Sequence, residues 1–574
     1  MPVVNATVAA VFEQIADLLD IQGANPFRIR AYRNAARTIG TLGSDIKAML
    51  EKGADLRDLP GVGDDLAAKI REIVETGKSA FLERLQKQVP PAVTELLRIP
   101  GLGPKRVRRL YEDLDVQSLE QLLRAAHDGR IRELPGFGEK TESRIVEAAQ
   151  AQLSKARRFK LAVAAQYAEP LVAYLRGTPG VGQVVIAGSF RRMRETVGDL
   201  DILVTAQSSG KVMERFVQYE DVREILSQGD TRGSVVLKCG LQVDIRVVAP
   251  ASFGAALHYF TGSKAHNIAI RRLAQEKGLK VNEYGVYRGA RRIAGETEQS
   301  VYASVGLPYI EPELREDHGE IEAARTGRLP ELVELAELKG DLHAHSTASD
   351  GHDSIRDMAL AARARGLSYL AITDHTRRLT VAHGLDPVRL SRQIDLIDLL
   401  NRDLSGITVL RGTEVDILED GSLDLPDSIL SRLDIVVAAV HSNFNLSRSQ
   451  QTQRILKAME NPYVSMLAHP TGRLIDEREP YDADMPRIIR KARAAGCHLE
   501  LNAHPERLDL LDSHCRMAKG EGVLVSVNSD AHSVPEFDNL RFGVGQARRG
   551  WLEEKDVLNT RPLAQVRKLL KRPR

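Results

Sequence analysis

The sequence has little cysteine, few aromatic residues and no long uncharged apolar run. Its three cysteines, Cys239, Cys497 and Cys515, lie far apart and do not have the spacing of a disulfide framework. No stretch reaches the roughly 18 apolar residues that a transmembrane helix needs. The N-terminus lacks the basic segment of a signal peptide. We therefore expect a cytoplasmic protein that does not enter a membrane.

An excess of one charge is also missing. The formal net charge is only +2 over 574 residues, so any binding to nucleic acid has to come from local sites rather than from overall attraction. The length exceeds what one hydrophobic core supports, and it predicts roughly three to five domains.

The most informative stretch present is 186–203, which reads IAGSFRRMRETVGDLDIL. A short apolar run ends at Gly188-Ser189, where a helix is expected to begin with its N–H groups free for phosphate. Asp199 and Asp201 follow in a second apolar run, two residues apart. On a strand they point to the same side, where paired carboxylates suit Mg²⁺ or Mn²⁺. The stretch predicts nucleotidyl transfer from a triphosphate.

A third acid follows in VVLKCGLQVDIRVV, which we interpret as a hairpin that turns near Cys239-Gly240. Its second arm places Asp244 on a strand expected beside the first pair. Three carboxylates on adjacent strands can hold two cations about 4 Å apart. An isolated Asp-x-Asp pair could equally be a solvated strand edge. The Gly-Ser turn and the third acid favour the metal site.

The first ~150 residues are predicted to form short helices joined by glycine turns. One pattern, apolar-Pro-Gly-apolar-Gly, recurs at 59–63, 99–103 and 134–138 and precedes stretches rich in Lys or Arg. This is the helix-hairpin-helix pattern, in which turn amides and a helix N-terminus face a phosphate. We predict non-specific DNA binding, with a helical scaffold as the alternative. The predicted contacts are Gly61, Gly63, Gly101, Gly103, Gly136 and Gly138.

Residues 1–316 resemble the X family of DNA polymerases, the family of DNA polymerase beta. The motifs that carry the resemblance are the Gly-Ser turn with Arg192, G198-D-L-D201, V243-D-I-R246, Y259-F-T-G-S263 and V281-N-E-Y284. The resemblance implies a nucleotidyltransferase palm with Asp199, Asp201 and Asp244 as metal ligands. It also implies nucleotide contacts from Gly188, Ser189, Arg192, Gly198, Tyr259, Phe260, Gly262, Asn267 and Arg271. Gln242 stands where animal relatives carry an arginine.

The same resemblance implies a second activity in the N-terminal part. Lys69 occupies the position of the family lysine that attacks deoxyribose 5′-phosphate, and an amine nucleophile of this kind needs a lowered pKa. Arg28, Tyr32 and Arg57 match contacts to the 5′-phosphate, whereas Asp65 replaces a family lysine. Deoxyribose-phosphate lyase activity is therefore a hypothesis.

Beyond residue 339 strand-like and helical segments alternate, and seven such repeats predict a closed or nearly closed parallel barrel. His, Asp and Glu recur at the C-terminal ends of these strands, which is where barrel enzymes build their sites. Such a donor set favours Zn²⁺, Mn²⁺ or Fe over Ca²⁺. The residues at these ends are His343, His345, Asp374, His375, Glu414, His441, His469, Asp530 and His532.

These residues lie in motifs such as D341-L-H-A-H345 and D530-A-H532, which resemble the polymerase-and-histidinol-phosphatase (PHP) domain. The resemblance implies a trinuclear centre that hydrolyses phosphoesters. One metal would be held by His343, His345, Glu414 and Asp530, and the second by Glu414, His441 and His469. Asp350, His375 and His532 would hold the third.

We therefore expect a multidomain α+β and α/β protein, monomeric and nucleoid-associated, that fills gaps in DNA repair from dNTPs on gapped or nicked DNA. The barrel would act as a 3′–5′ exonuclease, or as an abasic-site endonuclease or 3′-phosphatase. The alternatives are a small-molecule nucleotidyltransferase fused to a phosphatase, and a DNA-end scaffold. The expected boundaries are 1–85 (lyase-like), 86–155 (helix-hairpin-helix), 156–250 (palm), 251–316 (polymerase subdomain), 317–338 (linker) and 339–574 (barrel).

Overall fold

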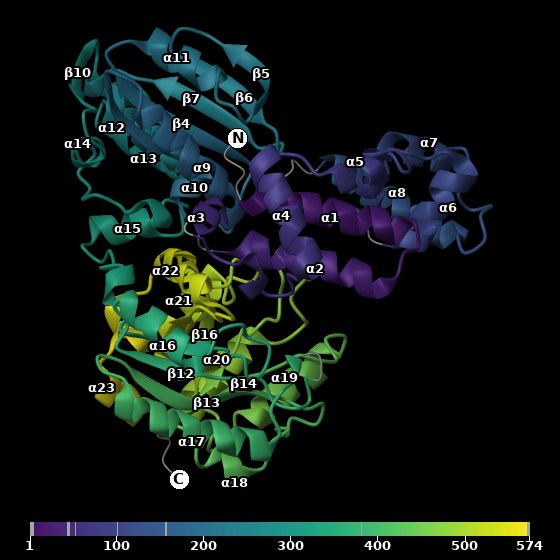
Figure 1. Ribbon diagram of the computed structural model, residues 1–574. Helices are drawn as coiled ribbons and strands as arrows, with labels where there is room; N and C mark the ends of the chain where they lie inside the picture. The colour runs from purple at the N-terminus through teal and green to yellow at the C-terminus, as the bar shows by residue number, and fades with distance from the viewer. Residues whose placement is uncertain are drawn as a thin grey trace. The chain divides into compact units, whose positions relative to one another are not determined.

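The computed structural model describes residues 5–42, 46–51, 53–99, 101–154, 158–379 and 382–570. The chain folds into two units, residues 1–159 and 160–574, which are described separately (Figure 1). The expected boundary near residue 156 lies close to this division. No described helix is both long and apolar enough to cross a membrane.

The first unit is helical, as the sequence predicts. Its α-helices are α1 (Asn5–Ile21), α2 (Pro26–Thr41), α3 (Ile46–Glu51), α4 (Asp64–Thr76), α5 (Ala80–Gln86), α6 (Pro104–Leu114), α7 (Leu119–His127) and α8 (Glu139–Ser154). Short 3₁₀ turns lie at η1 (Leu56–Asp58) and η2 (Pro91–Arg98). Helix α4 shows why these segments pack: Leu66, Ile70 and Ile73 recur at helical spacing and are buried together.

The three glycine turns share one backbone conformation. The first glycine of each turn, Gly61, Gly101 or Gly136, has a positive φ of 67°, 94° or 87°. Glycine adopts this region without the steric cost that a side chain would bring. The second glycine of the first two turns, Gly63 or Gly103, is the N-cap of the helix that follows. The repeated pattern therefore encodes a repeated turn geometry.

The second unit begins with a palm-like sheet. Its strands run in the order β2-β4-β7-β6-β5, and β4 pairs with β7 in parallel while the other pairs are antiparallel. Their bounds are β2 (Val181–Ile186), β4 (Asp199–Ala206), β5 (Val222–Gln228), β6 (Arg232–Leu237) and β7 (Gln242–Val247). The helices are α9 (Leu161–Arg176), α10 (Gly188–Arg191) and α11 (Ser209–Val217), and β3 (Thr196–Val197) precedes β4. The predicted hairpin between β6 and β7 is present, with Gly240 at φ 93°.

A smaller subdomain follows the palm. It contains α12 (Phe253–Thr261), α13 (Lys264–Glu276), β8 (Lys280–Asn282), β9 (Gly285–Arg288), β10 (Arg291–Ala294) and α14 (Glu298–Ser304). Strands β8, β9 and β10 form a small antiparallel sheet.

The connection at 317–338, expected as a polar linker, is packed against the rest of this unit. Its helix α15 (Glu320–Arg325) buries Glu320 completely, and the carboxylate is 2.6 Å from Nδ1 of His266. The backbone N–H groups of Asp317 and His318 also donate to it. Val333 lies in the core of the barrel. Polar composition did not predict this burial because the compensating partners are distant in sequence or belong to the backbone.

The last part is a seven-stranded parallel sheet with its strands in sequence order, which confirms the expected barrel. The strands are β11 (Gly340–Ala344), β12 (Tyr369–Ile372), β13 (Thr408–Asp416), β14 (Ile435–Ala439), β15 (Met466–Leu467), β16 (His498–Asn502) and β17 (Val525–Asn528). Between them lie α16 (Ile355–Ala364), α17 (Pro387–Asp403), α18 (Asp427–Leu430), α19 (Arg448–Ala458), α20 (Met485–Ala495) and α21 (Asp512–Glu521). Helices α22 (Leu540–Arg549) and α23 (Leu563–Leu570) complete it (Figure 1).

The barrel is nearly closed. One isolated parallel bridge joins Ala344 to Ala531, and the N–H of Asp530 donates to the carbonyl of His343 at 3.1 Å. The last strand thus returns to the first. All seven strand ends are brought to one rim, where the predicted metal ligands lie.

Candidate functional sites in the palm and the barrel

The three predicted acids of the palm lie on two neighbouring parallel strands. Asp201 of β4 is in register with Asp244 of β7, and Asp199 is in register with Gln242. Side chains two residues apart on a strand share a face, so Asp199 and Asp201 point to the same side. Leu200 and Ile202 point to the opposite side and are buried. The sheet therefore gathers three carboxylates on one face.

The electrostatics of this cluster fit a cation. Burial, followed by the charges of Asp199 and Asp244, raises the pKa of Asp201 to about 7. Like charges held this close disfavour the ionised form of each other. Mg²⁺ or Mn²⁺ would offset that repulsion, and carboxylate oxygens are the ligands such ions take. Gln242 adds no charge, but its side-chain amide donates to Asp244 at 3.1 Å.

The turn at Gly188 lies directly against this cluster. Gly188 begins α10 with φ 64°, and a Cβ built there would lie 2.7 Å from Oδ2 of Asp201. The N–H of Ala187 donates to the carbonyl of Asp201 at 2.7 Å. Glycine is favoured at this position, first by its backbone conformation and then by the close approach of the Asp201 carboxylate.

We predict that Gly188→Ala lowers templated extension about 10- to 100-fold, because it shifts Asp201 and costs about 1–2 kcal/mol of backbone strain. Single-turnover extension on gapped DNA measures the effect. Gly210→Ala is the control, since a Cβ at Gly210 meets nothing within 4 Å. Equal rates for the two variants would contradict the role of this turn.

The other predicted nucleotide contacts fall into two groups. Ser189 lies on α10, Arg192 directly follows it, and Gly198 joins β3 to β4. In the smaller subdomain Asn267 donates to the carbonyls of Tyr259 and Gly262 at 2.7 and 3.1 Å. Nε of Arg271 donates to the carbonyl of Asn267, and the rings of Tyr259 and Phe260 meet edge to face. The structure thus brings Tyr259, Phe260, Gly262, Asn267 and Arg271 into one connected group.

At the barrel rim, Glu414 is the hub of the predicted metal ligands. Its two oxygens lie 2.9 Å from His375 and from His469, and 3.2 Å from His441. His343 and His345 lie 3.4 and 3.6 Å from the same carboxylate. Burial raises the pKa of Glu414, but the charges of His375, His441 and His343 outweigh it and hold this pKa well below its usual value. The hub is therefore an ionised, fully buried carboxylate.

Two further acids complete the rim. Asp530 lies 3.1 Å from Nε2 of His345 and 3.4 Å from Nε2 of His343. Asp350 lies 3.5 Å from His375 and 3.6 Å from His532. Three groups have donor atoms close enough to share an ion: His345, Asp350, His375 and His532; His343, His345 and Asp530; and His375, Glu414 and His441. These groups overlap the three predicted ligand sets, although His345 and His375 each occur in two of them.

Buried ring nitrogens that lack hydrogen-bond partners in the described part of the chain also indicate that the rim residues fit metal ions. Nε2 of His343 and Nδ1 of His345 are buried and have no hydrogen-bond partner among the described residues. A buried polar atom without a partner is costly unless it binds an ion. Two ligand candidates also have unusual backbones, since His469 and Asp530 have φ of 24° and 55°. Strained residues of this kind concentrate at functional sites.

Two residues that support the ligands were not predicted. Glu500 on β16 is fully buried and lies 2.7 Å from Nδ1 of His343. Asp416 lies 2.6 Å from Nδ1 of His441. Each carboxylate fixes the ring of a ligand through its outer nitrogen. The spacing of Asp416 two residues after Glu414 on one strand was the signal that could have found it.

In the first unit the predicted lyase residues gather around one ring. Lys69 pairs with Asp65 and lies 5.5 Å from the ring centroid of Phe81, over which Arg28 lies at 5.0 Å. Tyr32 is only 1% exposed and stacks against Phe81, so its hydroxyl lies in the core and not at the surface.

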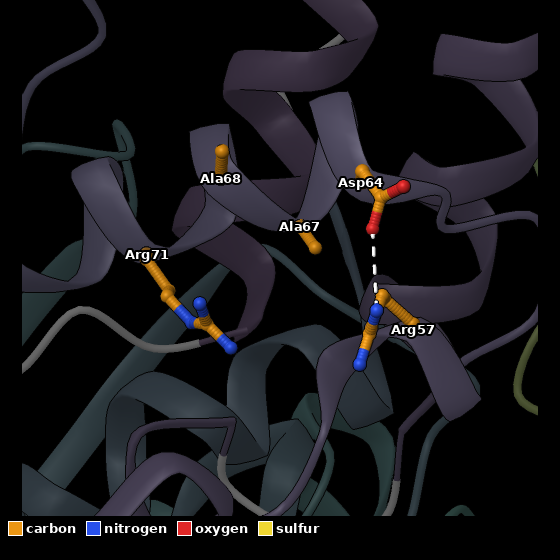
Figure 2. Close-up of a pocket in the computed structure, with 5 residues that line it drawn as sticks. All are labelled: Arg57, Asp64, Ala67, Ala68 and Arg71. Carbon is orange, nitrogen blue, oxygen red and sulfur yellow. Dashed lines mark ion pairs between the residues drawn. The ribbon is translucent and has the colours of Figure 1, made fainter.

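A pocket of about 320 Å³ lies beside this group on α4 and η1. Its lining residues are Arg57, Asp64, Ala67, Ala68 and Arg71 (Figure 2). Nη1 of Arg57 lies 3.5 Å from Asp64, and Arg57 also pairs with Asp55. The predicted phosphate contact Arg57 is therefore paired with two carboxylates, those of Asp55 and Asp64.

The sequence matches four known families over most of these parts. Residues 4–79 match the helix-hairpin-helix domain and 93–151 the SAM-like helix-hairpin-helix tandem. Residues 256–316 match the DNA polymerase beta thumb, and 341–504 match the PHP domain. These matches confirm the two resemblances predicted from sequence motifs.

Similarity to individual proteins extends these matches. The barrel is 30% identical over 234 residues to a "probable phosphatase" of Thermoanaerobacter sp. (strain X514), which covers 38% of this chain and 89% of that protein. A "probable phosphatase" of Syntrophotalea carbinolica is 32% identical over 232 residues. The DNA polymerase/3′-5′ exonuclease PolX of Bacillus subtilis (strain 168) is 40% identical over 572 residues, covering 98% of this chain and 99% of that protein. Over nearly its whole length, therefore, this chain belongs to the PolX family of DNA polymerase/3′-5′ exonucleases.

Proposed function

We propose that this chain is a DNA polymerase that fills short gaps during repair and trims 3′ ends at its barrel. The observation that carries the polymerase assignment is the register of Asp201 with Asp244 against the Gly188 turn. Membership of the PolX family supports both activities. The helix-hairpin-helix turns bind the DNA backbone without regard to its base sequence.

In the palm, Asp199, Asp201 and Asp244 would hold two Mg²⁺ or Mn²⁺ ions, which activate the 3′-hydroxyl and balance charge on the triphosphate. The Gly188 turn and Ser189 present N–H and hydroxyl groups to the phosphates, and Arg192 adds a cation. The Asn267 and Arg271 group faces the nascent pair. Asp199 is exposed and Asp201 and Asp244 are half-buried, which leaves this face accessible to a primer end, whereas Leu200 and Ile202 anchor the strand in the core.

In the barrel, His343, His345, Asp350, His375, Glu414, His441, His469, Asp530 and His532 would hold up to three ions of Zn²⁺, Mn²⁺ or Fe. Such ions supply an activated water and accept charge from the scissile phosphate. Glu500 and Asp416 hold the His343 and His441 rings in the orientation that binding requires. Abasic-site endonuclease and 3′-phosphatase activities, monomeric state and a nucleoid location stay predictions.

Extension of a labelled primer across a one-nucleotide gap tests the polymerase assignment. We expect addition of the nucleotide that the template specifies. Addition without a template requirement, or transfer to a small molecule only, would favour the small-molecule nucleotidyltransferase. Binding of DNA ends without any reaction would favour the scaffold.

Lyase activity is a second proposal, favoured by the placement of Lys69 and Arg28 over the Phe81 ring. A lysine in this role forms a Schiff base with the sugar aldehyde, so borohydride should trap a covalent adduct on DNA that carries a 5′-deoxyribose phosphate. We expect Lys69→Ala to lower trapping at least about tenfold. Lys78→Ala, an exposed lysine beyond the end of α4, is the control. Equal trapping by both variants would contradict the proposal.

A further inference from the structure

The turn that carries the triphosphate contacts is seated on helix α22 of the barrel. Met193, which follows Arg192, has φ 53°, and its side chain fills the space that a larger residue would need at Gly545. A Cβ at Gly545 would lie 2.4 Å from Cε of Met193. Nη1 of Arg549 donates to the carbonyl of Arg192 at 3.0 Å. The barrel thus contacts both the backbone and a side chain of the nucleotide-binding turn.

One carboxylate joins the same elements. Oε1 of Glu316 accepts from Nε of Arg192 at 2.9 Å and from Nη1 of Arg549 at 3.0 Å. Nη1 of Arg194 lies 3.7 Å from the same oxygen. The side chains of Glu316, Arg192 and Arg549 are only 11%, 13% and 3% exposed. Water screens buried charge pairs such as these less than exposed ones, so they interact more strongly.

Two nitrogens of the Arg192 guanidinium have partners in this arrangement. Besides Glu316, its Nη1 donates to the carbonyl of Thr261 at 2.7 Å. Its charge also reaches the metal-binding face, where it helps to lower the pKa of Asp201 against the larger effects of burial, Asp199 and Asp244. The guanidinium therefore lies close to the proposed triphosphate site but is paired with the carboxylate of Glu316. An anionic nucleotide has to compete with Glu316 for it.

The surroundings make an exchange feasible. If Arg192 turned to a triphosphate, Glu316 would keep Arg549 and Arg194 as cationic partners. A buried carboxylate left without a cation is strongly unfavourable, and these two arginines avoid that cost. Nη2 of Arg549 is fixed in turn by Asp512 at 2.6 Å. Arg549 is thus a rigid barrel residue that holds Glu316 in place.

We propose that Glu316 competes with the incoming triphosphate for Arg192, and that Arg549 of the barrel sets how strongly it competes. The proposal rests on the proposed function, in which Arg192 binds the triphosphate. Glu316 and Arg549 are then positioning residues: they touch neither nucleotide nor metal but tune the affinity for dNTP. The barrel regulates the polymerase through this contact while it carries out its own reaction.

Single-turnover extension on a one-nucleotide gap, measured against dNTP concentration, separates nucleotide binding from the chemical step. We expect Glu316→Gln to lower the apparent dissociation constant for dNTP about fivefold, since the competing charge is gone. The maximal rate should change less than about twofold. Arg549→Met should raise the constant about fivefold, because Glu316 then has only Arg192 and Arg194. The double variant should behave as Glu316→Gln, because Arg549 acts through Glu316.

Glu313→Gln is the matched control. Glu313 lies three residues before Glu316 and accepts from Nε of Arg548, the neighbour of Arg549, at 2.7 Å. Among the described residues its ion-pair partner is Arg548 and not a residue of the Gly188 turn, so its removal should leave the dNTP constant unchanged. Exonuclease activity and thermal unfolding of every variant verify that the barrel remains folded.

A Glu316→Gln variant with an unchanged or raised dNTP constant would overturn the proposal, because the carboxylate would then be a tether or a support and not a competitor. A double variant that keeps the weak binding of Arg549→Met would also overturn it. Failure of the wild-type chain to extend the gapped primer is a different result. It would contradict the polymerase assignment itself.

Discussion

The double substitution Asp199→Ala with Asp201→Ala is expected to lower templated extension by at least about a thousandfold and to leave 3′–5′ trimming intact. Asp244 alone cannot hold two cations, and the loss of that charge stabilisation removes several kcal/mol from the transition state. Extension and trimming are measured on the same gapped duplex. The separation of effects is expected because the acids lie on β4 and β7 of the palm, whereas the predicted barrel ligands lie on β11 and β13 and in the loops that follow the barrel strands.

Asp230→Asn is the control for this experiment. Asp230 is an exposed carboxylate in the turn between β5 and β6 of the same sheet. Its substitution removes one negative charge from the palm, as each of the two aspartate substitutions does. It leaves the face that carries Asp199, Asp201 and Asp244 unchanged. A comparable loss of extension in this variant would show that general charge matters and not the carboxylate cluster.

The second large effect is expected from His343→Ala with His345→Ala. Both rings are fully buried at the rim, where they face Glu414 and Asp530. Without them the group of His343, His345 and Asp530 is lost, although Glu414 keeps His375, His441 and His469 as neighbours, so trimming should fall at least about a thousandfold. Extension by the palm should stay within about twofold of wild type. Release of labelled nucleotide from a 3′-recessed duplex measures trimming.

This variant also removes buried volume, so its folding has to be verified. Thermal unfolding and the retained extension serve that purpose, because the palm and the barrel belong to one unit. Glu500→Gln is a milder companion: it keeps the ring of His343 in place but weakens its outer hydrogen bond, and metal affinity should fall about 10- to 100-fold. Unchanged trimming in the double histidine variant would place the exonuclease elsewhere.

Most of the fold was predictable because local patterns carry it. The glycine turns of the first unit use a backbone conformation that only glycine adopts readily. The presence of Gly61 and Gly101 in the sequence therefore predicts the geometry of these turns. The strands of the barrel end in His, Asp or Glu at regular intervals, and parallel strands bring such ends together. The resemblance assigns Asp350 to a metal together with His375 and His532, and the structure brings its carboxylate within 3.6 Å of both rings.

The rest depends on contacts that no local pattern records. Glu316 and Arg549 are more than two hundred residues apart in sequence, and their ion pair exists only because the barrel packs against the palm. Glu500 lies in a fully buried strand, where its charge is compensated by His343 from another strand. Tyr32 shows the opposite case, since a residue matched to a surface contact lies in the core. Burial of this kind follows from packing and is not visible in a motif.

We propose that one chain carries two separate metal-dependent reactions. The most direct test follows extension and trimming of one gapped, 3′-labelled duplex with the wild type, the double aspartate variant and the double histidine variant. We expect the double aspartate variant to lose only extension and the double histidine variant to lose only trimming. Loss of both activities in either variant, or of neither in both, would contradict it.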